Sequence, residues 1–373
     1  MKRRALLFSA AAVLMSTAAQ AKTTRHVKKA KQVKQAKQVK KVAPAHPAPP
    51  HPAPPHPAPP RPAPPPPAHA GLQPLKAAKT QLIAFNTSAF PYIGLVPDTR
   101  KLFLDVKQGT RRGHTTLHGE VCWEDKTYHD RRSLLYLPSG YNPALPGLIV
   151  LFLHGQGATL ERDVIGRQGI ARQVSEAGQN MALVAPQLAL DAADSSAGNF
   201  WKPGHLARFI DETAERLMRL YGDKRAGPHF NAAPVVIVAY SGGYVTAAYS
   251  LDRGGATYRV KGVILMDALY GDEEKFANWA ATRRQTGFLL SAFTDSTREY
   301  NATLQAQLAK RRIAHADMLP RNLSPGTMTF LSCGGGDLHG DFMTKAWGQE
   351  PLAQALAMIP GYPQTAPASK KTS

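Results

Sequence analysis

The strongest constraint on this chain is an apolar run that ends abruptly at a serine among small residues. Residues 235–238 read Val-Val-Ile-Val, a pattern typical of a strand buried on both faces. The run leads into residues 239–243 (Ala-Tyr-Ser-Gly-Gly), and the residues beyond favour a helix. A serine at such a turn can be a nucleophile, provided that small residues stand two positions before and after it. Ala239 and Gly243 meet this condition for Ser241. An ordinary turn between a strand and a helix is the alternative interpretation.

Strand and helix patterns alternate along the rest of the chain. We predict strands over residues 121–123, 133–137, 147–153, 181–185, 235–238, 260–266, 288–293 and 328–333. We predict helices over residues 160–177, 206–220, 244–251, 273–281 and 298–311, and a last helix after residue 339. This order predicts an α/β fold with a mainly parallel central sheet and helices on both faces.

Polar and glycine-rich turns follow several of these strands, where an α/β sheet gathers its functional groups. Residues 154–157 read His-Gly-Gln-Gly, and such a turn leaves backbone N–H groups free. We expect the N–H groups of Gly155, Gln156 and Gly242 to bind a developing oxyanion. His154 is expected to orient this turn and to take no part in catalysis.

The order of the remaining groups completes a recognisable pattern. Asp267 and Asp295 follow two later strands, and His339 follows the last one after three glycines. With the stretch LLYLPSGYNPALPGLIVLFLHGQG, the chain resembles the α/β-hydrolase fold, specifically its secreted serine esterases, lipases and polyester depolymerases, over roughly residues 115–350. The resemblance implies a catalytic triad in the order serine, acid, histidine, with Ser241 and His339 as members. Gln156 replaces a glycine of the HGGG turn common in that group. This change keeps the backbone donor but alters access to the oxyanion site.

Two carboxylates compete for the place of the triad acid. Asp295 has the commoner location, after the seventh strand, but Ser296 and Glu299 beside it match a capping box that explains it as part of a helix start. Asp267 directly follows an apolar strand without a capping pattern, and a carboxylate there is costly unless it is paired. We therefore predict Asp267 as the triad acid and keep Asp295 as the alternative.

Aromatic residues near these turns are candidates for a substrate pocket. Tyr240 and Tyr244 flank the serine, and Trp201 and Trp279 lie in segments that follow other strands. Burial in the core is an equal explanation for the two tryptophans. The segment of residues 270–288 is too short for a large lid, so we expect an open or shallowly covered site.

Cys122 and Cys333 are the only cysteines. In an exported protein they permit one disulfide, and two free buried thiols are the alternative. The sequence contains no HExxH motif, CxxC pair or Walker-type loop, so we predict no cofactor, metal or nucleotide.

The first 70 residues differ from the rest in composition. Residues 1–21 combine a basic start, a short apolar run and an A-x-A end, as in a secretory signal peptide, and the apolar run is too short for a stable transmembrane segment. Residues 22–70 are a Lys-rich stretch followed by His-Pro-Ala-Pro-Pro repeats, a composition that predicts a disordered tail. We divide the remainder into an N-terminal wrap (71–114), a hydrolase domain (115–362) and a disordered end (363–373).

The net charge of +20 is concentrated in the tail, because residues 1–70 hold 13 of the 46 Lys and Arg residues and no acid. We expect a periplasmic or secreted protein whose tail could contact an anionic cell-envelope surface, and export argues against nucleic acid as a partner.

The function predicted from the sequence is a serine hydrolase, most simply a carboxylic ester hydrolase, acting on a small or polymeric ester. Two alternatives stay open: a peptidase or amidase with the same triad, and an envelope-binding protein whose hydrolase-like site is idle.

Overall fold

The computed structural model describes residues 71–363. The predicted signal peptide, the tail and residues 364–373 lie outside the described residues. Within the described part, no helix is both long enough and apolar enough to cross a membrane.

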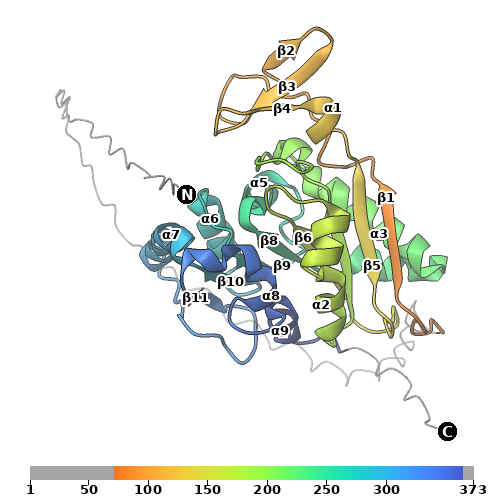
Figure 1. The fold of residues 1–373 in the computed structure, drawn as a ribbon. Helices are drawn as coiled ribbons and strands as arrows, with labels where there is room; N and C mark the ends of the chain where they lie inside the picture. The colour runs from red at the N-terminus through yellow and green to blue at the C-terminus, as the bar shows by residue number, and fades with distance from the viewer. Residues whose placement is uncertain (1–70, 364–373) are drawn as a thin grey trace, which may run out of the picture. The chain divides into compact units, whose positions relative to one another are not determined.

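Eight strands form the central sheet (Figure 1). In spatial order they are β1 (Lys79–Ala84), β5 (Arg132–Leu137), β7 (Met181–Pro186), β6 (Leu148–Leu153), β8 (Val235–Tyr240), β9 (Val260–Met266), β10 (Phe288–Phe293) and β11 (Met328–Ser332). Strand β5 is antiparallel to β1 and β7, and the other neighbours are parallel. A second strand that runs antiparallel, with the third and fourth strands exchanged in space, is the topology of the α/β-hydrolase fold. The predicted fold class is therefore confirmed.

Continuous apolar sequence explains the centre of this sheet. Every residue of β6, β7 and β8 is buried, because helices cover both faces. In β8, Val235 and Ile237 pack into the core on one face, while Val236 and Val238 pack into the core on the other.

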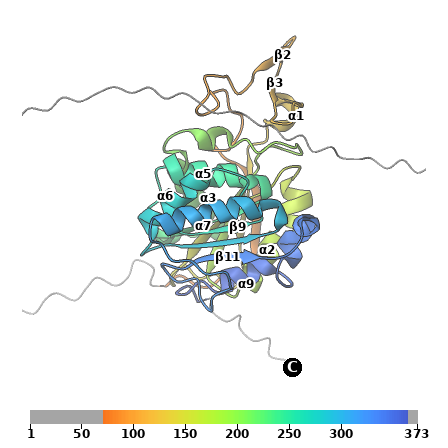
Figure 2. The same cartoon turned by 90° about the vertical axis from the view of Figure 1, so that its left-hand side faces the viewer.

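The helices divide between the two faces (Figure 2). One core receives apolar side chains from α3 (His205–Tyr221), α5 (Tyr244–Arg253), α6 (Glu273–Arg283) and α7 (Arg298–Lys310). The opposite core receives them from α2 (Ile170–Glu176), α8 (Phe342–Lys345) and α9 (Pro351–Ala357). The short helix α4 (Gly227–Ala232) packs beside α3.

One predicted helix is interrupted. The pattern over residues 160–177 predicts continuous helix, but the structure has a π-helical segment, Leu160–Arg167, and then α2. Gly169 separates them with φ of 57°, the left-handed region that ends helices.

A separate three-stranded antiparallel sheet contains β2 (Val106–Gln108), β3 (Arg111–Thr115) and β4 (Val121–Trp123), followed by helix α1 (Glu124–Thr127). Two expectations change here. Residues 121–123 are not a strand of the central sheet, because three partly exposed residues cannot span its core. The central sheet also begins before residue 115, since β1 pairs with β5 along its whole length.

The disulfide that the sequence permits does not form, because Cys122 and Cys333 are both free. Cys122 lies in the small sheet and packs against one core of the molecule. Cys333 follows β11 at the edge of the central sheet and packs against the core on the opposite face. The eight-stranded sheet separates the two thiols, so the alternative of two free cysteines holds.

Candidate active site

Ser241 occupies a strained turn between β8 and α5. The strand ends at Tyr240, residues Ser241–Gly243 form a single 3-10 turn, and α5 begins at Tyr244. The φ of Ser241 is 51°, in the left-handed region that few residues other than glycine adopt. Such strain persists only where the surrounding structure holds it, and it concentrates at functional sites.

Close packing explains the small residues around this serine. A Cβ atom on Gly243 would lie 2.3 Å from the carbonyl oxygen of Leu153 on the neighbouring strand. A Cβ atom on Gly155 would lie 2.7 Å from the Cβ of Ser241. Both positions therefore require glycine, and they bring the turn after β6 against the serine.

A chain of hydrogen bonds joins Ser241, His339 and Asp267. The Oγ of Ser241 lies 3.0 Å from Nε2 of His339, and Nδ1 of His339 lies 2.6 Å from Oδ2 of Asp267. With the Nδ1 proton donated to the carboxylate, Nε2 can accept the proton of the serine hydroxyl. This is the tautomer that a general base needs.

Asp267 is fully buried and is held by hydroxyl and amide donors. Its Oδ1 accepts from the Thr294 N–H at 2.9 Å and from the Thr297 hydroxyl at 2.7 Å, and the Thr294 hydroxyl donates to Oδ2 at 2.9 Å. Burial by itself raises the pKa of this carboxyl, but the hydrogen bonds from His339, Thr294 and Thr297 outweigh it and lower the pKa below its usual value. Asp267 therefore stays ionised beside the imidazole.

Asp295 does not contact His339. Its side chain is 59% exposed and pairs with Arg298 on the first turn of α7. The expected capping box is also wrong, because Thr294 is the N-cap of this segment and accepts from the Ser296 N–H. The structure thus places one of the two candidate acids beside the histidine and the other on the surface.

Two side chains support the segment that carries His339, a 3-10 helical stretch of residues Gly336–Asp341. The ring of Tyr240 stacks on the imidazole of His339 with centroids 5.4 Å apart, and its hydroxyl donates to the His339 carbonyl at 2.7 Å. Arg167 donates to the carbonyl of Gly340 at 2.9 Å. Tyr240 therefore supports the loop and does not line the pocket as expected. Arg167 was not identified from the sequence, where nothing distinguishes it from other surface arginines.

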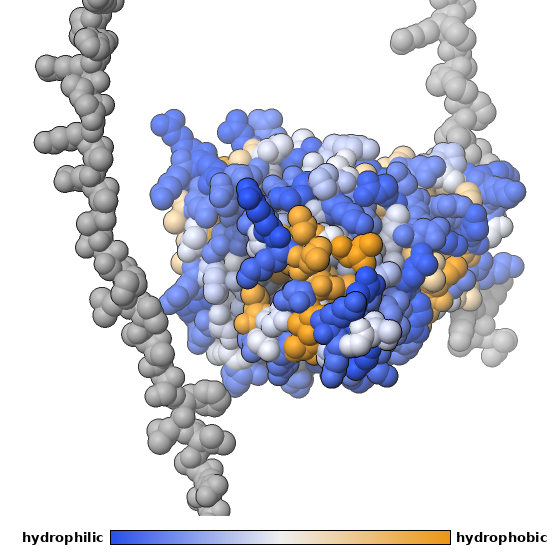
Figure 3. Space-filling view, turned by 90° about the horizontal axis from the view of Figure 1, so that it is seen from above, coloured by the Kyte–Doolittle hydropathy of each residue, from blue (hydrophilic) through white to orange (hydrophobic). Residues whose placement is uncertain are grey.

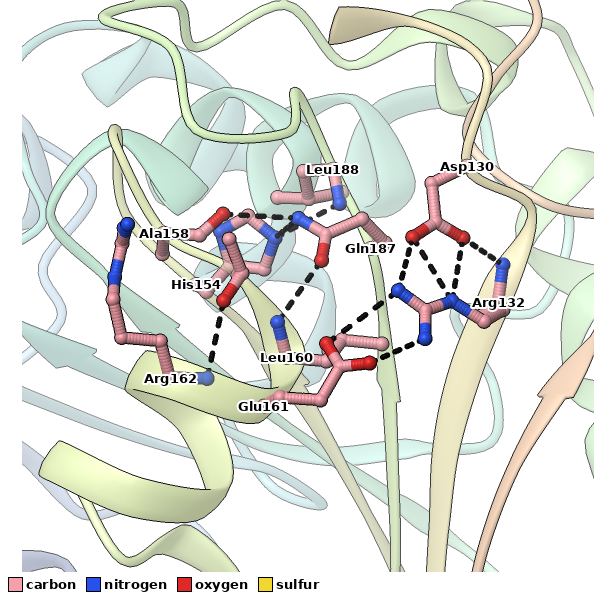
Figure 4. A network of polar contacts seen from close by, with 10 residues as sticks. Asp130, Arg132, His154, Ala158, Leu160, Glu161, Arg162, Gln187 and Leu188 are labelled. Carbon is pink, nitrogen blue, oxygen red and sulfur yellow. Dashed lines mark hydrogen bonds and ion pairs between the residues drawn. The ribbon is translucent and has the colours of Figure 1, made fainter. Parts of the chain in front are cut away.

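A buried polar network fixes the turn after β6 (Figure 4). The Nδ1 of His154 donates to the Gly155 carbonyl at 2.8 Å, and its Nε2 accepts from the Leu188 N–H at 2.9 Å. Burial lowers the pKa of His154 to about 4, so the ring is neutral and acts as a structural link. Gln187 extends the network by donating to the Ala158 carbonyl at 3.1 Å.

This turn leaves a backbone donor beside the serine. The Gly157 N–H donates to the Ala192 carbonyl, whereas the Gln156 N–H has no hydrogen-bond partner within residues 71–363. Gly242 stands in the first helical turn after β8, where backbone N–H groups lack partners inside the helix. The side chain of Gln156 is tied back to the Ser195 hydroxyl at 2.9 Å. Gln156 and Gly242 are thus suited to bind an oxyanion through their N–H groups, and the Gly155 N–H, which also has no hydrogen-bond partner within residues 71–363, stays a predicted third donor.

A cavity of about 540 Å³ opens beside Ser241. Its walls come from the turn after β6, the loop before α3, helix α5 and the small sheet, and they include Trp201 and Tyr244 as predicted. Trp279 does not line it, and the alternative of burial in the core holds for this residue, because its side chain is 4% exposed and packs into the core under α6.

The small sheet forms one wall of the site, which we expected to be open or shallowly covered. His114, Thr115, Leu117 and His118 line the same cavity as Ser241. Leu117 is 99% exposed at the turn of this sheet, and an apolar patch lies on the face seen in Figure 3. This wall comes from the segment before β5, whereas our expectation considered only the segment of residues 270–288.

No known protein family and no curated protein matches the sequence. Solved structures similar to the chain include a mutant of the feruloyl esterase module from Clostridium thermocellum complexed with sinapinate, with 15% identity, coverage of 74% of this chain and 96% of the other, and a TM-score of 0.42. A ferulic acid esterase has 12% identity, coverage of 75% and 97%, and a TM-score of 0.41. The S-formylglutathione hydrolase FrmB from Staphylococcus aureus has 15% identity, coverage of 67% and 97%, and a TM-score of 0.38.

Proposed function

We propose that this protein is a serine hydrolase that cleaves a carboxylic ester through an acyl-enzyme on Ser241. The observation that carries the proposal is the hydrogen-bonded chain from Ser241 through His339 to the buried Asp267, at the edge of a cavity of about 540 Å³.

Each group has a defined part in the reaction. The Nε2 atom of His339 takes the hydroxyl proton as the Oγ of Ser241 attacks the carbonyl carbon. The N–H groups of Gln156 and Gly242 stabilise the negative oxygen of the tetrahedral intermediate. The imidazolium then gives its proton to the leaving alcohol, and the ester bond breaks to leave an acyl-enzyme. A water molecule, deprotonated by the same imidazole, releases the acid and restores Ser241.

Turnover of p-nitrophenyl esters by the full-length protein tests the proposal. Wild type should release nitrophenolate, and Ser241→Ala should lower kcat by about 10⁶-fold while the melting temperature stays within a few degrees of wild type. Amide substrates in the same panel separate an esterase from a peptidase or amidase. A folded wild type that turns over neither class would contradict the proposal and would favour an idle site.

We also propose that the protein acts outside the cytoplasm and that its basic tail holds it near an anionic envelope surface. The support is the A-x-A pattern of residues 1–21 and the excess of lysine in residues 22–42. Fractionation of cells that express the full chain, with and without residues 22–70, tests both parts. Retention of the protein in the cytoplasm would contradict export, and equal release of both forms from the envelope would contradict the tail's role.

A further inference from the structure

The cavity beside Ser241 contains one buried carboxylate that the hydrolytic mechanism does not use. Asp194 lies in the loop between β7 and α3, is 9% exposed, and lines the cavity. The next residue, Ser195, packs against the turn that carries Ser241, because a Cβ atom on Gly242 would lie 2.4 Å from the Ser195 hydroxyl oxygen. Asp194 therefore faces the space that a substrate bound at Ser241 would fill.

Two hydroxyl groups hold Asp194 without neutralising it. Tyr128 donates to Oδ2 at 3.0 Å, and Ser196 donates to Oδ1 at 2.9 Å. No ion pair to Asp194 occurs within residues 71–363. A carboxylate has about four acceptor positions, so these donors leave about half of them open. A buried charge in this state favours a further donor or a cation.

The rest of the lining agrees with this preference. His114 is bound through Nδ1 to the Phe103 carbonyl at 2.7 Å, so Nε2 is the ring nitrogen left for a substrate. Among residues 71–363, no lysine or arginine lines the cavity. The other walls are largely apolar and include Val96, Trp201 and Val245. An anionic group would thus meet the Asp194 carboxylate without a lysine or arginine of the described residues beside it.

We propose that Asp194 selects esters that carry a hydrogen-bond donor, such as an ammonium or a hydroxyl group, at a position remote from the scissile carbonyl. Esters that carry a carboxylate at that position are rejected. This inference rests on the proposed ester hydrolysis at Ser241 and adds the substrate class. Tyr128 and Ser196 position the carboxylate, and Asp194 itself is the specificity residue.

Four series of p-nitrophenyl esters test this proposal on the full-length protein. Linear acyl chains of increasing length end in a methyl, a hydroxyl, an ammonium or a carboxylate group, and kcat/KM is compared at the best length of each series. We expect the ammonium and hydroxyl esters to exceed the methyl ester by about tenfold or more, the size expected of one charge-assisted hydrogen bond, and the carboxylate ester to be the poorest.

Asp194→Asn should remove about tenfold or more of the ammonium preference and leave the methyl ester within about threefold of wild type. Asp191→Asn is the matched control, because Asp191 lies in the same loop but is exposed and pairs with Arg162, and it should keep the wild-type order.

The outcomes separate this inference from the proposed function. If wild type cleaves all four series equally well, or prefers the carboxylate ester, Asp194 does not select the substrate, although ester hydrolysis stands. The order of kcat/KM among the four series for wild type therefore tests the inference even if Asp194→Asn does not fold. If the variant folds and keeps the wild-type preference, the inference is also overturned. If wild type cleaves no ester and Ser241 reacts with no phosphonate probe, ester hydrolysis itself fails.

Discussion

At the scale of single residues, the most consequential placement is that of Asp267. The carboxylate is fully buried, yet four donors, including His339, satisfy it. Three of the four come from Thr294 and Thr297, just beyond β10. The commoner acid position, Asp295, lies in the same segment but points to solvent. The segment after β10 thus supplies donors to an acid that follows β9.

Substitution of the two acids separates their roles. Asp267→Asn should lower kcat for ester hydrolysis by about 10⁴-fold, because the amide would favour the wrong tautomer of His339. Asp295→Asn is the matched control and should stay within about twofold, because surface ion pairs contribute little. The assignment is wrong if Asp295→Asn abolishes activity and Asp267→Asn retains it.

At the scale of elements, the packing of β6 against the start of α5 controls the site. The carbonyl of Leu153 approaches Gly243 so closely that a methyl group has no room, and backbone cannot move aside as a flexible side chain can. The same contact holds the Gln156 turn beside Ser241.

Gly243→Ala should therefore lower the free energy of unfolding by about 2 kcal/mol or more, because overpacking forces the strand and helix apart. Gly340→Ala is the control, because a Cβ atom there would meet nothing within 4 Å. Urea unfolding of both variants measures the difference. Equal stability of Gly243→Ala and wild type would contradict the close approach.

The cysteines also belong to the element scale, because β4 and β11 lie in different sheets. Burial raises the pKa of Cys333 to about 11 and also raises the pKa of Cys122, so both thiols stay protonated and react slowly at neutral pH. Thiol titration of the unreduced protein should find two thiols after unfolding and slow reaction before it. A titration that finds none would restore the disulfide.

The sequence predicted those elements whose pattern is continuous. The buried strands, the serine turn and the place of His339 could be predicted because long apolar runs end there in small or polar residues. Of the small sheet, the sequence predicted only the strand of residues 121–123 (β4), because a strand as short as β2, of 3 residues, carries no clear period. The contribution of the small sheet to the cavity therefore became visible only in the structure, as did the place of Asp194 in the wall of the same cavity. The support that Tyr240 gives to His339 depends on contact between residues 99 positions apart.

At the scale of the whole molecule, two buried neutral histidines link folding to pH. Burial lowers the pKa of His154 and of His205 to about 4, against an ordinary value of 6.5. The unfolded chain therefore takes up protons first as the pH falls below about 6.5, and the folded protein loses stability between about pH 6.5 and pH 4.

Lowering the pH from 7 to 5.5 should reduce the free energy of unfolding by about 2 kcal/mol from these two groups together. Urea unfolding at both values measures this difference. His205→Gln should remove about half of it, whereas the variant of an exposed histidine, His118→Gln, should keep it. Unchanged or greater stability of wild type at pH 5.5 would contradict the burial of neutral histidines.

The central claim is that Ser241 is a nucleophile activated by His339. Reaction of the full-length protein with a fluorophosphonate, followed by mass spectrometry of its peptides, tests this claim most directly. We predict one adduct per chain, located on Ser241, with no adduct on Ser241→Ala and strongly slowed labelling of His339→Ala. A folded wild-type protein that stays unlabelled, or that carries the adduct on another serine, would contradict the account.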